Sequence, residues 1–260
     1  MNVLDKIVLR KREEVADAKQ KVAIAELESS PAFAVKPLVF KDFLLDETRS
    51  GIIAEFKRHS PSKGLINGTS VVEEVTQAYN QAGASALSIL TDKDFFGGDA
   101  SDLLKARAVN QIPILRKDFI IDEYQILEAK SWGADIILLI AAILTPKQIA
   151  DFGSFAQSLG LNVLLEVHDL AELERSICPH LNAIGVNNRN LGDFTVNIQT
   201  SFDLVDKIPN DFLKISESAI DNPAVINQLK AVGFNGFLIG ENFMKTENPG
   251  LAMKNFVKEL

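Results

Sequence analysis

The sequence predicts a closed (β/α)8 barrel with an N-terminal helical extension, and three observations support this fold. Eight short apolar runs alternate with helix-like segments from residue 51 onward. The runs lack the polar alternation of a half-exposed sheet, as expected for strands buried on both faces. Polar residues follow several runs at their carboxyl ends, which in this fold meet at one mouth. An open doubly wound sheet is the alternative, but the sequence contains no G-x-G-x-x-G fingerprint for a dinucleotide.

Strands and helices are assigned in order along the chain. The predicted strands span residues 51–57, 86–90, 112–116, 135–140, 162–166, 183–186, 212–215 and 236–239. A capping box at Ser70 and Glu73 begins the first barrel helix, and Gly83 ends it. The next two helices begin near Asp99 and at Asp122. Each predicted strand is therefore followed by a helix.

The later helices carry clear start signals. Thr145, with Pro146 next and Gln148 three residues on, combines an N-cap, a proline at the first helical position and a capping-box glutamine. Asp169 and Glu172 form a second box. Further helices begin near residues 222–223 and close the chain around residues 251–257.

Residues 1–48 lie outside the repeat, and we treat them as an extension that caps the barrel within one domain spanning residues 1–260. An amphipathic helix is predicted from the apolar positions Val3, Leu4, Ile7, Val8, Val15 and Ala18. Two interpretations stay open at this point. The helix either covers one barrel end for stability or caps the substrate mouth.

Composition excludes several functional classes. A net charge of −8 and a pI near 5.0 argue against nucleic acid or an anionic membrane as a partner. The longest apolar run, residues 136–144, is shorter than the ~20 residues of a membrane span. The single cysteine, Cys178, excludes a disulfide within the chain and suits a reducing compartment. Lys6 and Arg10 interrupt the N-terminal region where a signal peptide would be apolar, so we expect a cytoplasmic protein.

Charged residues at the ends of different predicted strands indicate a catalytic cluster, composed of Glu55, Lys57, Lys117, Glu166 and Glu217. A Glu55–Lys57 pair alone would be explained by packing. Burying five such groups is expensive, whereas acid–base catalysis needs several with separated pKa values.

The loops around the predicted mouth suggest how a substrate is held. The segments after the last two strands, residues 216–219 and 239–242, occupy the usual phosphate site of this fold. Pro61, Phe95, Phe96 and Phe119 serve either as core residues or as a wall for a flat aromatic ligand. The histidines share no metal-ligand spacing, so we predict no metal, and we interpret His168 as loop structure.

Five segments together resemble the indole-3-glycerol phosphate synthase family, in order and spacing across essentially the whole chain. They are residues 53–64 (IAEFKRHSPSKG), 115–120 (LRKDFI), 165–168 (LEVH), 185–191 (GVNNRNL) and 216–218 (SES). The resemblance implies ring closure, decarboxylation and dehydration of 1-(2-carboxyphenylamino)-1-deoxyribulose 5-phosphate in tryptophan biosynthesis, without cofactor or metal.

The resemblance also implies residue roles. Lys117 would be the general acid of ring closure and Glu166 the acid–base partner of dehydration. Lys57 would hold the substrate carboxylate, and Glu55 would orient the lysines. Asn187 and Glu217 complete the implied catalytic set. The expected substrate-binding residues are Ser60, Pro61, Phe95, Phe96, Phe119, Arg189, Ser218, Gly240 and Glu241.

Two positions depart from the family pattern, and both lie in the expected phosphate site. Ala219 stands where the family usually has glycine, and we expect its backbone to avoid positive φ. Glu241 stands where a small hydroxyl residue is usual, and we expect its carboxylate to turn away from the phosphate.

Two competing functions are weighed. Phosphoribosylanthranilate isomerases are barrels with a cysteine after the first strand, whereas Cys178 precedes the sixth predicted strand. A non-catalytic binding barrel would need no proton donor such as Lys117. We therefore expect a phosphorylated small-molecule substrate, no nucleic acid or membrane partner, and a monomer that associates weakly with other tryptophan-pathway enzymes.

Overall fold

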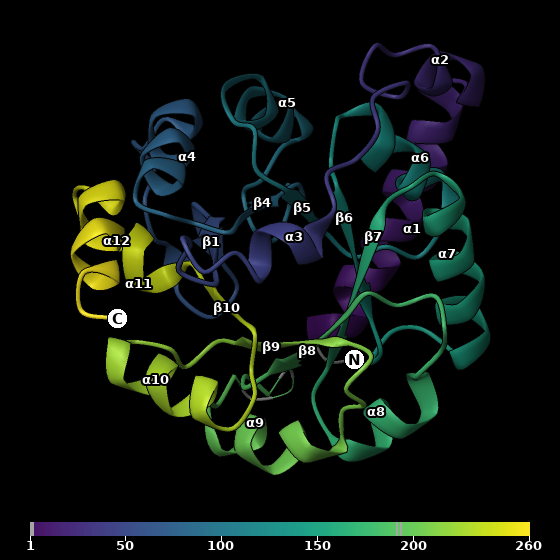
Figure 1. Cartoon of the computed structure of the whole chain (residues 1–260). Coiled ribbons are helices and arrows are strands. Elements are labelled where there is room, and N and C mark those ends of the chain that lie inside the picture. The colour runs from purple at the N-terminus through teal and green to yellow at the C-terminus, as the bar shows by residue number, and fades with distance from the viewer. Residues whose placement is uncertain (1–2, 191, 193) are drawn as a thin grey trace.

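The computed structural model describes residues 3–190, 192 and 194–260, so Leu191 of the 185–191 motif and the first two residues of the extension lie outside the described part. Within it, eight parallel strands close into a barrel in the order β1-β10-β9-β8-β7-β6-β5-β4, which confirms the predicted fold (Figure 1). The strands are β1 (Ile52–Phe56), β4 (Ala86–Leu90), β5 (Ile114–Lys117), β6 (Ile136–Ile140), β7 (Asn162–Val167), β8 (Ala183–Asn187), β9 (Leu213–Glu217) and β10 (Gly236–Ile239). A small hairpin of β2 (His59–Ser60) and β3 (Gly64–Leu65) lies in the loop after β1.

Helices form a ring around the strands (Figure 1). The ring consists of α4 (Val72–Gln81), α5 (Ala100–Val109), α6 (Glu123–Ser131), α7 (Pro146–Ser158), α8 (Leu170–Ser176), α9 (Gln199–Leu204) with the 3-10 turn η1 (Val205–Lys207), α10 (Pro223–Ala231), α11 (Glu241–Met244) and α12 (Pro249–Val257). α12 packs against α4 and so closes the ring. No helix of the described residues is long and apolar enough to cross a membrane.

Successive side chains on each strand point alternately into two hydrophobic cores, and this alternation turns the charged side chains of the site toward the inside of the barrel. On β1, Ile52, Ala54 and Phe56 join the core between strands and helices, whereas Ile53 joins the core inside the barrel. Because successive side chains on a strand point to opposite faces, Glu55 shares the inner face with Ile53. The same rule places Lys117 on the inner face of β5. The apolar pattern of each strand thus determines where its charged residue points.

Among the strand boundaries that differ from prediction, two place a charged residue of the site inside a strand. β5 was expected at residues 112–116 but ends at Lys117, and β9 was expected at 212–215 but ends at Glu217. Lys117 pairs with Leu90 in register, and Glu217 pairs with Leu238 on β10 and Asn187 on β8. Both charged residues are therefore the last residues of rigid strands, not loop residues.

The predicted helix starts are confirmed in part. The Thr145–Gln148 capping box is present, with Thr145 Oγ1 accepting from the Gln148 N–H. The box predicted at Ser70 is wrong, because α4 has Val71 as its N-cap without a side-chain bond, and Asn67 Oδ1 accepts the Ser70 N–H instead.

Residues of the extension form α1 (Val3–Lys21), α2 (Ile24–Glu28) and α3 (Phe40–Leu44). Near the mouth, Lys11 of α1 contacts Asp92 and Asp118, which follow β4 and β5. At the opposite end, the Phe40 N–H donates to Oδ1 of Asn162, the first residue of β7. In Figure 1, α3 lies inside the ring of helices, over the strands. The extension therefore reaches both ends of the barrel.

Candidate active site

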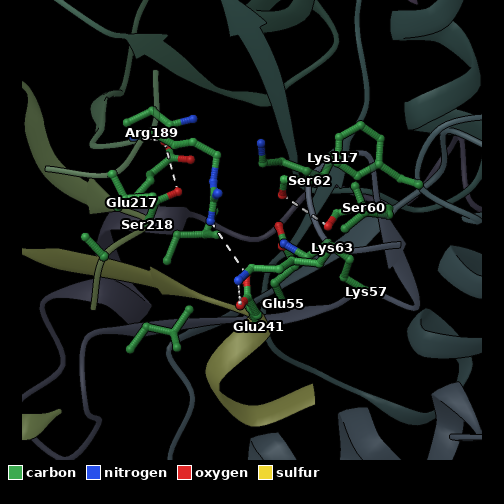
Figure 2. Close-up of a pocket in the computed structure, with 18 of the residues that line it drawn as sticks. Glu55, Lys57, Ser60, Ser62, Lys63, Lys117, Arg189, Glu217, Ser218 and Glu241 are labelled. Carbon is green, nitrogen blue, oxygen red and sulfur yellow. Dashed lines mark hydrogen bonds and ion pairs between the residues drawn. The ribbon is translucent and has the colours of Figure 1, made fainter. Parts of the chain in front are cut away.

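A cavity of about 510 Å³ opens at the carboxyl ends of the strands, within the size range of small-molecule sites. All but one of the site residues singled out in the sequence line it, and ten lining residues are labelled in Figure 2. Those that line it are Glu55, Lys57, Ser60, Pro61, Phe96, Lys117, Phe119, Glu166, Asn187, Arg189, Glu217, Ser218, Gly240 and Glu241. The barrel thus gathers residues spread over nearly the whole chain around one space.

An ion pair between Lys117 and Glu166 crosses the cavity floor. Lys117 Nζ donates to Glu166 Oε2 at 3.2 Å. Burial opposes the ammonium, but Glu166, Glu217 and Glu55 outweigh it and raise the pKa of Lys117 above its usual range. Burial likewise opposes the carboxylate, but Lys117, His168 and Asn187 hold the pKa of Glu166 well below its usual range. The pair is therefore an ammonium and a carboxylate at neutral pH.

Asn187 fixes the orientation of Glu166. Its Nδ2 donates to Glu166 Oε1 at 3.2 Å, while its Oδ1 accepts from Ser218 Oγ at 3.0 Å and from the Arg189 N–H at 3.1 Å. These bonds settle which end of the Asn187 amide is the donor. Glu166 is thereby held between Lys117 on one oxygen and an amide on the other.

Glu55 and Lys57 form a second pair next to the first. Glu55 Oε1 lies 2.8 Å from Lys57 Nζ, and Glu55 Oε2 accepts from Ser88 Oγ on the neighbouring β4 at 3.1 Å. Burial acts to raise the pKa of Glu55, but Lys57 and Lys117 overcome it and keep it below the usual value. Gly240 makes room for this carboxylate, since a Cβ there would lie 2.7 Å from Glu55 Oε1.

Glu217 differs from the other two carboxylates because it lacks a cation of its own. Among the described residues, its Oε1 has no hydrogen-bond partner although it is buried. Burial and the charge of Glu166 raise the pKa of Glu217 to about 8. Gly185 on β8 allows this position, because a Cβ there would lie 2.2 Å from Glu217 Oε1. Glu217 is therefore a mostly neutral carboxyl group with free hydrogen-bonding capacity.

One wall of the cavity is aromatic. The rings of Phe96 and Phe119 lie 5.9 Å apart at 40°, and both line the cavity. Phe95, which was expected beside them, does not line it. In the turn after β4, Asp92 Oδ1 accepts the N–H groups of both Phe95 and Phe96, and both side chains pack against the core inside the barrel, but only Phe96 reaches the cavity.

Cations and one carboxylate meet at the cavity rim. Glu241 lies 3.6 Å from Lys63 Nζ through Oε1 and 3.6 Å from Arg189 Nη2 through Oε2 (Figure 2). Glu241 therefore lines the cavity, and these two cations hold its carboxylate at the rim. That the carboxylate turns away from a bound phosphate stays a prediction.

The turn after β9 is strained. Ser218 and Ala219 have φ values of 64° and 60°, so the expectation that Ala219 avoids positive φ is also wrong. Each non-glycine residue in this region costs about 1–2 kcal/mol. The hydrogen bond from Ser218 to Asn187, and one from Asn188 Nδ2 to Ser218 O at 3.2 Å, hold the turn.

Sequence reasoning missed two residues of the site. Lys63 entered only as part of the 53–64 segment that carries the family resemblance. His168 was interpreted as loop structure, yet its Nε2 lies 3.3 Å from Glu166 Oε1. Its spacing of two from Glu166, at a strand end, was the available signal. Among residues 3–190, 192 and 194–260, no group of three or more potential ligands is arranged for a metal ion, and the absence of a metal stays a prediction.

Comparisons with known proteins identify the family and the fold. A family model for indole-3-glycerol phosphate synthase matches residues 4–256. A curated indole-3-glycerol phosphate synthase from Bacteroides thetaiotaomicron is 46% identical over 263 residues, covering 100% of this chain and 99% of that protein. A solved structure described as "Native KDPGal structure" shares the fold alone, with a TM-score of 0.56 at 13% identity over 80% of this chain and 91% of that one. The chain therefore belongs to the indole-3-glycerol phosphate synthase family and is a carboxy-lyase of tryptophan biosynthesis.

Proposed function

We propose that the cavity closes the indole ring with Lys117 as general acid and Glu166 as its acid–base partner. The observation that carries this assignment is the 3.2 Å contact between Lys117 Nζ and Glu166 Oε2 on the cavity floor. A proton donor and a proton acceptor held at this distance suit a reaction that adds a proton in one step and removes one in another.

Ring closure needs a donor, because attack of the aromatic carbon on the ketone generates an alkoxide. The raised pKa of Lys117 keeps it protonated and ready to give that proton. Lys57, 2.8 Å from Glu55, is placed to hold the substrate carboxylate until it leaves as carbon dioxide. Glu55 positions both lysines, since its charge acts on each.

Dehydration needs a base and an acid. Glu166, whose pKa is depressed, is ionised and can take the proton released as the indole double bond forms. The hydroxyl group leaves as water with a proton from a neighbouring ammonium. Asn187 keeps the Glu166 carboxylate in place between these steps.

Glu217 binds the sugar hydroxyls. A carboxyl group with a raised pKa both donates and accepts hydrogen bonds, and its unpartnered Oε1 provides a binding position inside the cavity. A hydroxyl group of the substrate would satisfy this buried oxygen.

The apolar wall of Pro61, Phe96 and Phe119 holds the anilino ring against the ketone. Such proximity contributes up to ~7–11 kcal/mol at best. We keep Phe95 out of this role because it does not line the cavity.

The phosphate lies at the rim, near Ser60, Ser218 and Gly240. Lys63 and Arg189 supply positive charge there, and both now contact Glu241. Substrate phosphate must therefore displace the Glu241 carboxylate or share these cations with it.

We also propose that residues 1–48 act as a cap within one domain spanning residues 1–260, supported by the contacts of Lys11 and Phe40 at opposite barrel ends. In the cell, we propose that the protein is a cytoplasmic monomer that associates weakly with other tryptophan-pathway enzymes. The free thiol of Cys178 is compatible with a reducing compartment. Sedimentation of the purified protein tests whether it is a monomer in solution.

One assay tests the function. The purified protein, without added metal or cofactor, should convert the carboxyphenylamino-deoxyribulose phosphate to a product with indole absorbance in the ultraviolet. Binding of the substrate without this absorbance change would support the competing interpretation as a non-catalytic barrel.

A further inference from the structure

His168 lies between two carboxylates at the end of β7. Its Nε2 lies 3.3 Å from Glu166 Oε1, and its Nδ1 lies 3.0 Å from Glu172 Oε2. The side chain of His168 is only 12% exposed. Ionised carboxylate oxygens accept hydrogen bonds but donate none, so each ring nitrogen is favoured to carry a proton. The geometry therefore favours a positively charged imidazolium here, and the mechanism above does not use it.

Glu172 fixes the orientation of this ring. Its carboxylate accepts the His168 backbone N–H at 2.9 Å as well as Nδ1. Asp169 caps α8 by accepting the Glu172 N–H at 2.8 Å, which holds Glu172 in the first turn of the helix. A ring that is bonded at Nδ1 presents its Nε2 to the other side, here to Glu166. The start of α8 therefore sets the position of the imidazole.

His168 acts on Glu166 beside the two hydrogen bonds that hold this carboxylate. Lys117 donates to Glu166 Oε2, and Asn187 donates to Oε1, each at 3.2 Å. His168 Nε2 makes no hydrogen bond among the described residues, so its 3.3 Å contact with Oε1 is an ion pair. Glu166 is 2% exposed, and a buried pair is screened little by solvent and salt.

A second cavity of about 490 Å³ lies beside the ring. His168, Asp169 and Glu172 line it, and Asp169 is exposed, so this cavity communicates with solvent. Glu172 thus faces water, which stabilises its ionised form without a further cation. His168 does not line the substrate cavity. It is therefore placed to act on Glu166 and not on the substrate.

The proposed mechanism changes the charge of Lys117, the main partner of Glu166. In ring closure an Nζ–H bond of Lys117 breaks and the proton goes to the substrate oxygen, which leaves a neutral amine. A buried carboxylate that loses its cation is destabilised relative to the carboxylic acid. A protonated Glu166 could not accept the proton that dehydration releases. The reaction therefore needs a second cation beside Glu166.

We propose that His168 is a positioning residue, whose positive charge keeps Glu166 ionised while Lys117 is neutral. Glu172 holds the ring and its charge in place. No bond to His168 forms or breaks in this role, and Asn187 keeps its bond to Glu166 throughout. This inference rests on the proposed roles of Lys117 and Glu166.

The electrostatics of the group support this role. Burial alone would lower the pKa of His168, but its contacts with Glu166 and Glu172 raise it to about 10, so the ring stays charged at neutral pH. Burial acts to raise the pKa of Glu166, whereas Lys117 and then His168 lower it. The charged groups that face this pair from the surrounding elements are Glu172, Asp169, Arg189, Lys117 and Glu217.

The competing interpretation is a purely structural ion pair at the start of α8. It predicts that loss of the imidazolium lowers stability and leaves the pH dependence of each chemical step unchanged. The two interpretations differ in the dehydration step, because only the positioning role requires the charge of His168 there.

His168→Gln removes this charge and keeps a polar side chain of similar length. Quenched single turnovers report the decarboxylated intermediate by its mass, that of the product plus one water. At pH 6, dehydration should slow by about tenfold or more and the intermediate should accumulate, since one unit in the pKa of Glu166 corresponds to a factor of ten. KM should not change, because His168 lies outside the substrate cavity. Raising the pH to 9 should restore the rate, because a carboxyl group with a raised pKa ionises there.

The matched control is His180→Gln. The ring of His180 contacts Gln157 and lines neither cavity, so this variant should dehydrate the intermediate at the wild-type rate. A wild-type dehydration rate in His168→Gln, or a slowdown of equal size at every pH, overturns the positioning role.

Nitrogen NMR of the wild-type protein tests the charge directly and does not depend on the folding of a variant. The His168 ring should carry protons on both nitrogens at pH 8, because its pKa is raised to about 10. In Glu172→Gln an oxygen remains for Nδ1 but the charge is gone, so the ring should lose its proton at lower pH. A neutral His168 in the wild-type protein at pH 8, or an unmoved titration in Glu172→Gln, contradicts the proposal.

Glu166→Gln distinguishes the failure of this inference from the failure of the proposed function. A wild-type rate of product formation in Glu166→Gln would overturn the proposed function itself. Loss of activity in Glu166→Gln, together with unaltered dehydration in His168→Gln, would leave the proposed function standing and overturn only the role of His168.

Discussion

Two buried lysines lie near the mouth of the barrel, and their surroundings differ. Lys11 of α1 is 2.6 Å from Glu14 and 2.9 Å from both Asp92 and Asp118, and its side chain is 4% exposed. Among the residues that the structure describes, Lys117 has one direct partner, at 3.2 Å, and its side chain is 17% exposed toward the cavity. Carboxylates raise the pKa of both lysines above the usual range.

The difference lies in where the unbonded oxygens face. Around Lys11, Asp118 also accepts from Arg116, Thr91 and the Phe119 N–H. Glu14 Oε1 has no hydrogen bond among the described residues, but Glu14 does not line the cavity. Around Lys117, Glu217 Oε1 has no hydrogen bond among the described residues. A raised pKa therefore does not distinguish a structural lysine from a catalytic one. A buried oxygen that faces a cavity and has no hydrogen bond does distinguish them.

The largest expected effect comes from Lys117→Met. Removing the proposed general acid should lower kcat by about 10²–10⁴-fold, the usual contribution of such a group. The protein should stay folded and bind substrate, because methionine fills the same space and Glu166 keeps its contacts with Asn187 and His168. Single-turnover rates and ligand binding measure both.

Lys105→Met on the exposed face of α5 is the matched control and should leave kcat unchanged. A fully active Lys117→Met protein would remove Lys117 from the mechanism.

Lys11→Met tests the other lysine, which we expect to contribute to stability and not to catalysis. It leaves Asp92 and Asp118 buried without their cation, and loss of one member of a buried ion network costs about 3–5 kcal/mol of unfolding free energy. Denaturant unfolding measures this loss. Lys19→Met, on the same helix with an exposed partner 2.7 Å away, should cost about 0–1 kcal/mol. Equal effects of the two changes would show that Lys11 is not part of a cooperative network.

Glu217→Gln tests the raised pKa of the Glu217 carboxyl group through the pH dependence of stability. The raised pKa, about 8, means that the folded protein keeps a proton on Glu217 that the unfolded chain releases near pH 4.5. Between these values the folded state binds more protons, so the free energy of unfolding falls as pH rises. The variant should lack this decline. Melting temperatures of both proteins from pH 5 to 8 check it, and parallel curves would contradict the raised pKa.

The sequence predicted most of the barrel because buried parallel strands leave apolar runs, and it predicted the cluster because charges at strand ends have few other uses. It did not predict that Phe96 lines the cavity while Phe95 does not, since adjacent phenylalanines in a loop give no alternating pattern to separate them. It could not predict the contact between Glu241 and two cations, which come from distant loops and meet only after the barrel closes. Nor did it predict the position of His168. In a capping box the Glu172 carboxylate would accept the N–H of the N-cap residue Asp169, but it accepts the N–H of His168 instead.

The smallest expected effect concerns Glu241 at the rim. Glu241→Ser frees Lys63 and Arg189 for the substrate phosphate, and exposed pairs of this kind are each worth about 0.2–1 kcal/mol. KM should therefore stay unchanged or fall by up to about fivefold, with kcat little affected. Glu247→Ser removes the same charge outside the cavity and controls for net charge. A large rise in KM for Glu241→Ser alone would mean that Glu241 holds the two cations in position for phosphate instead of competing for them.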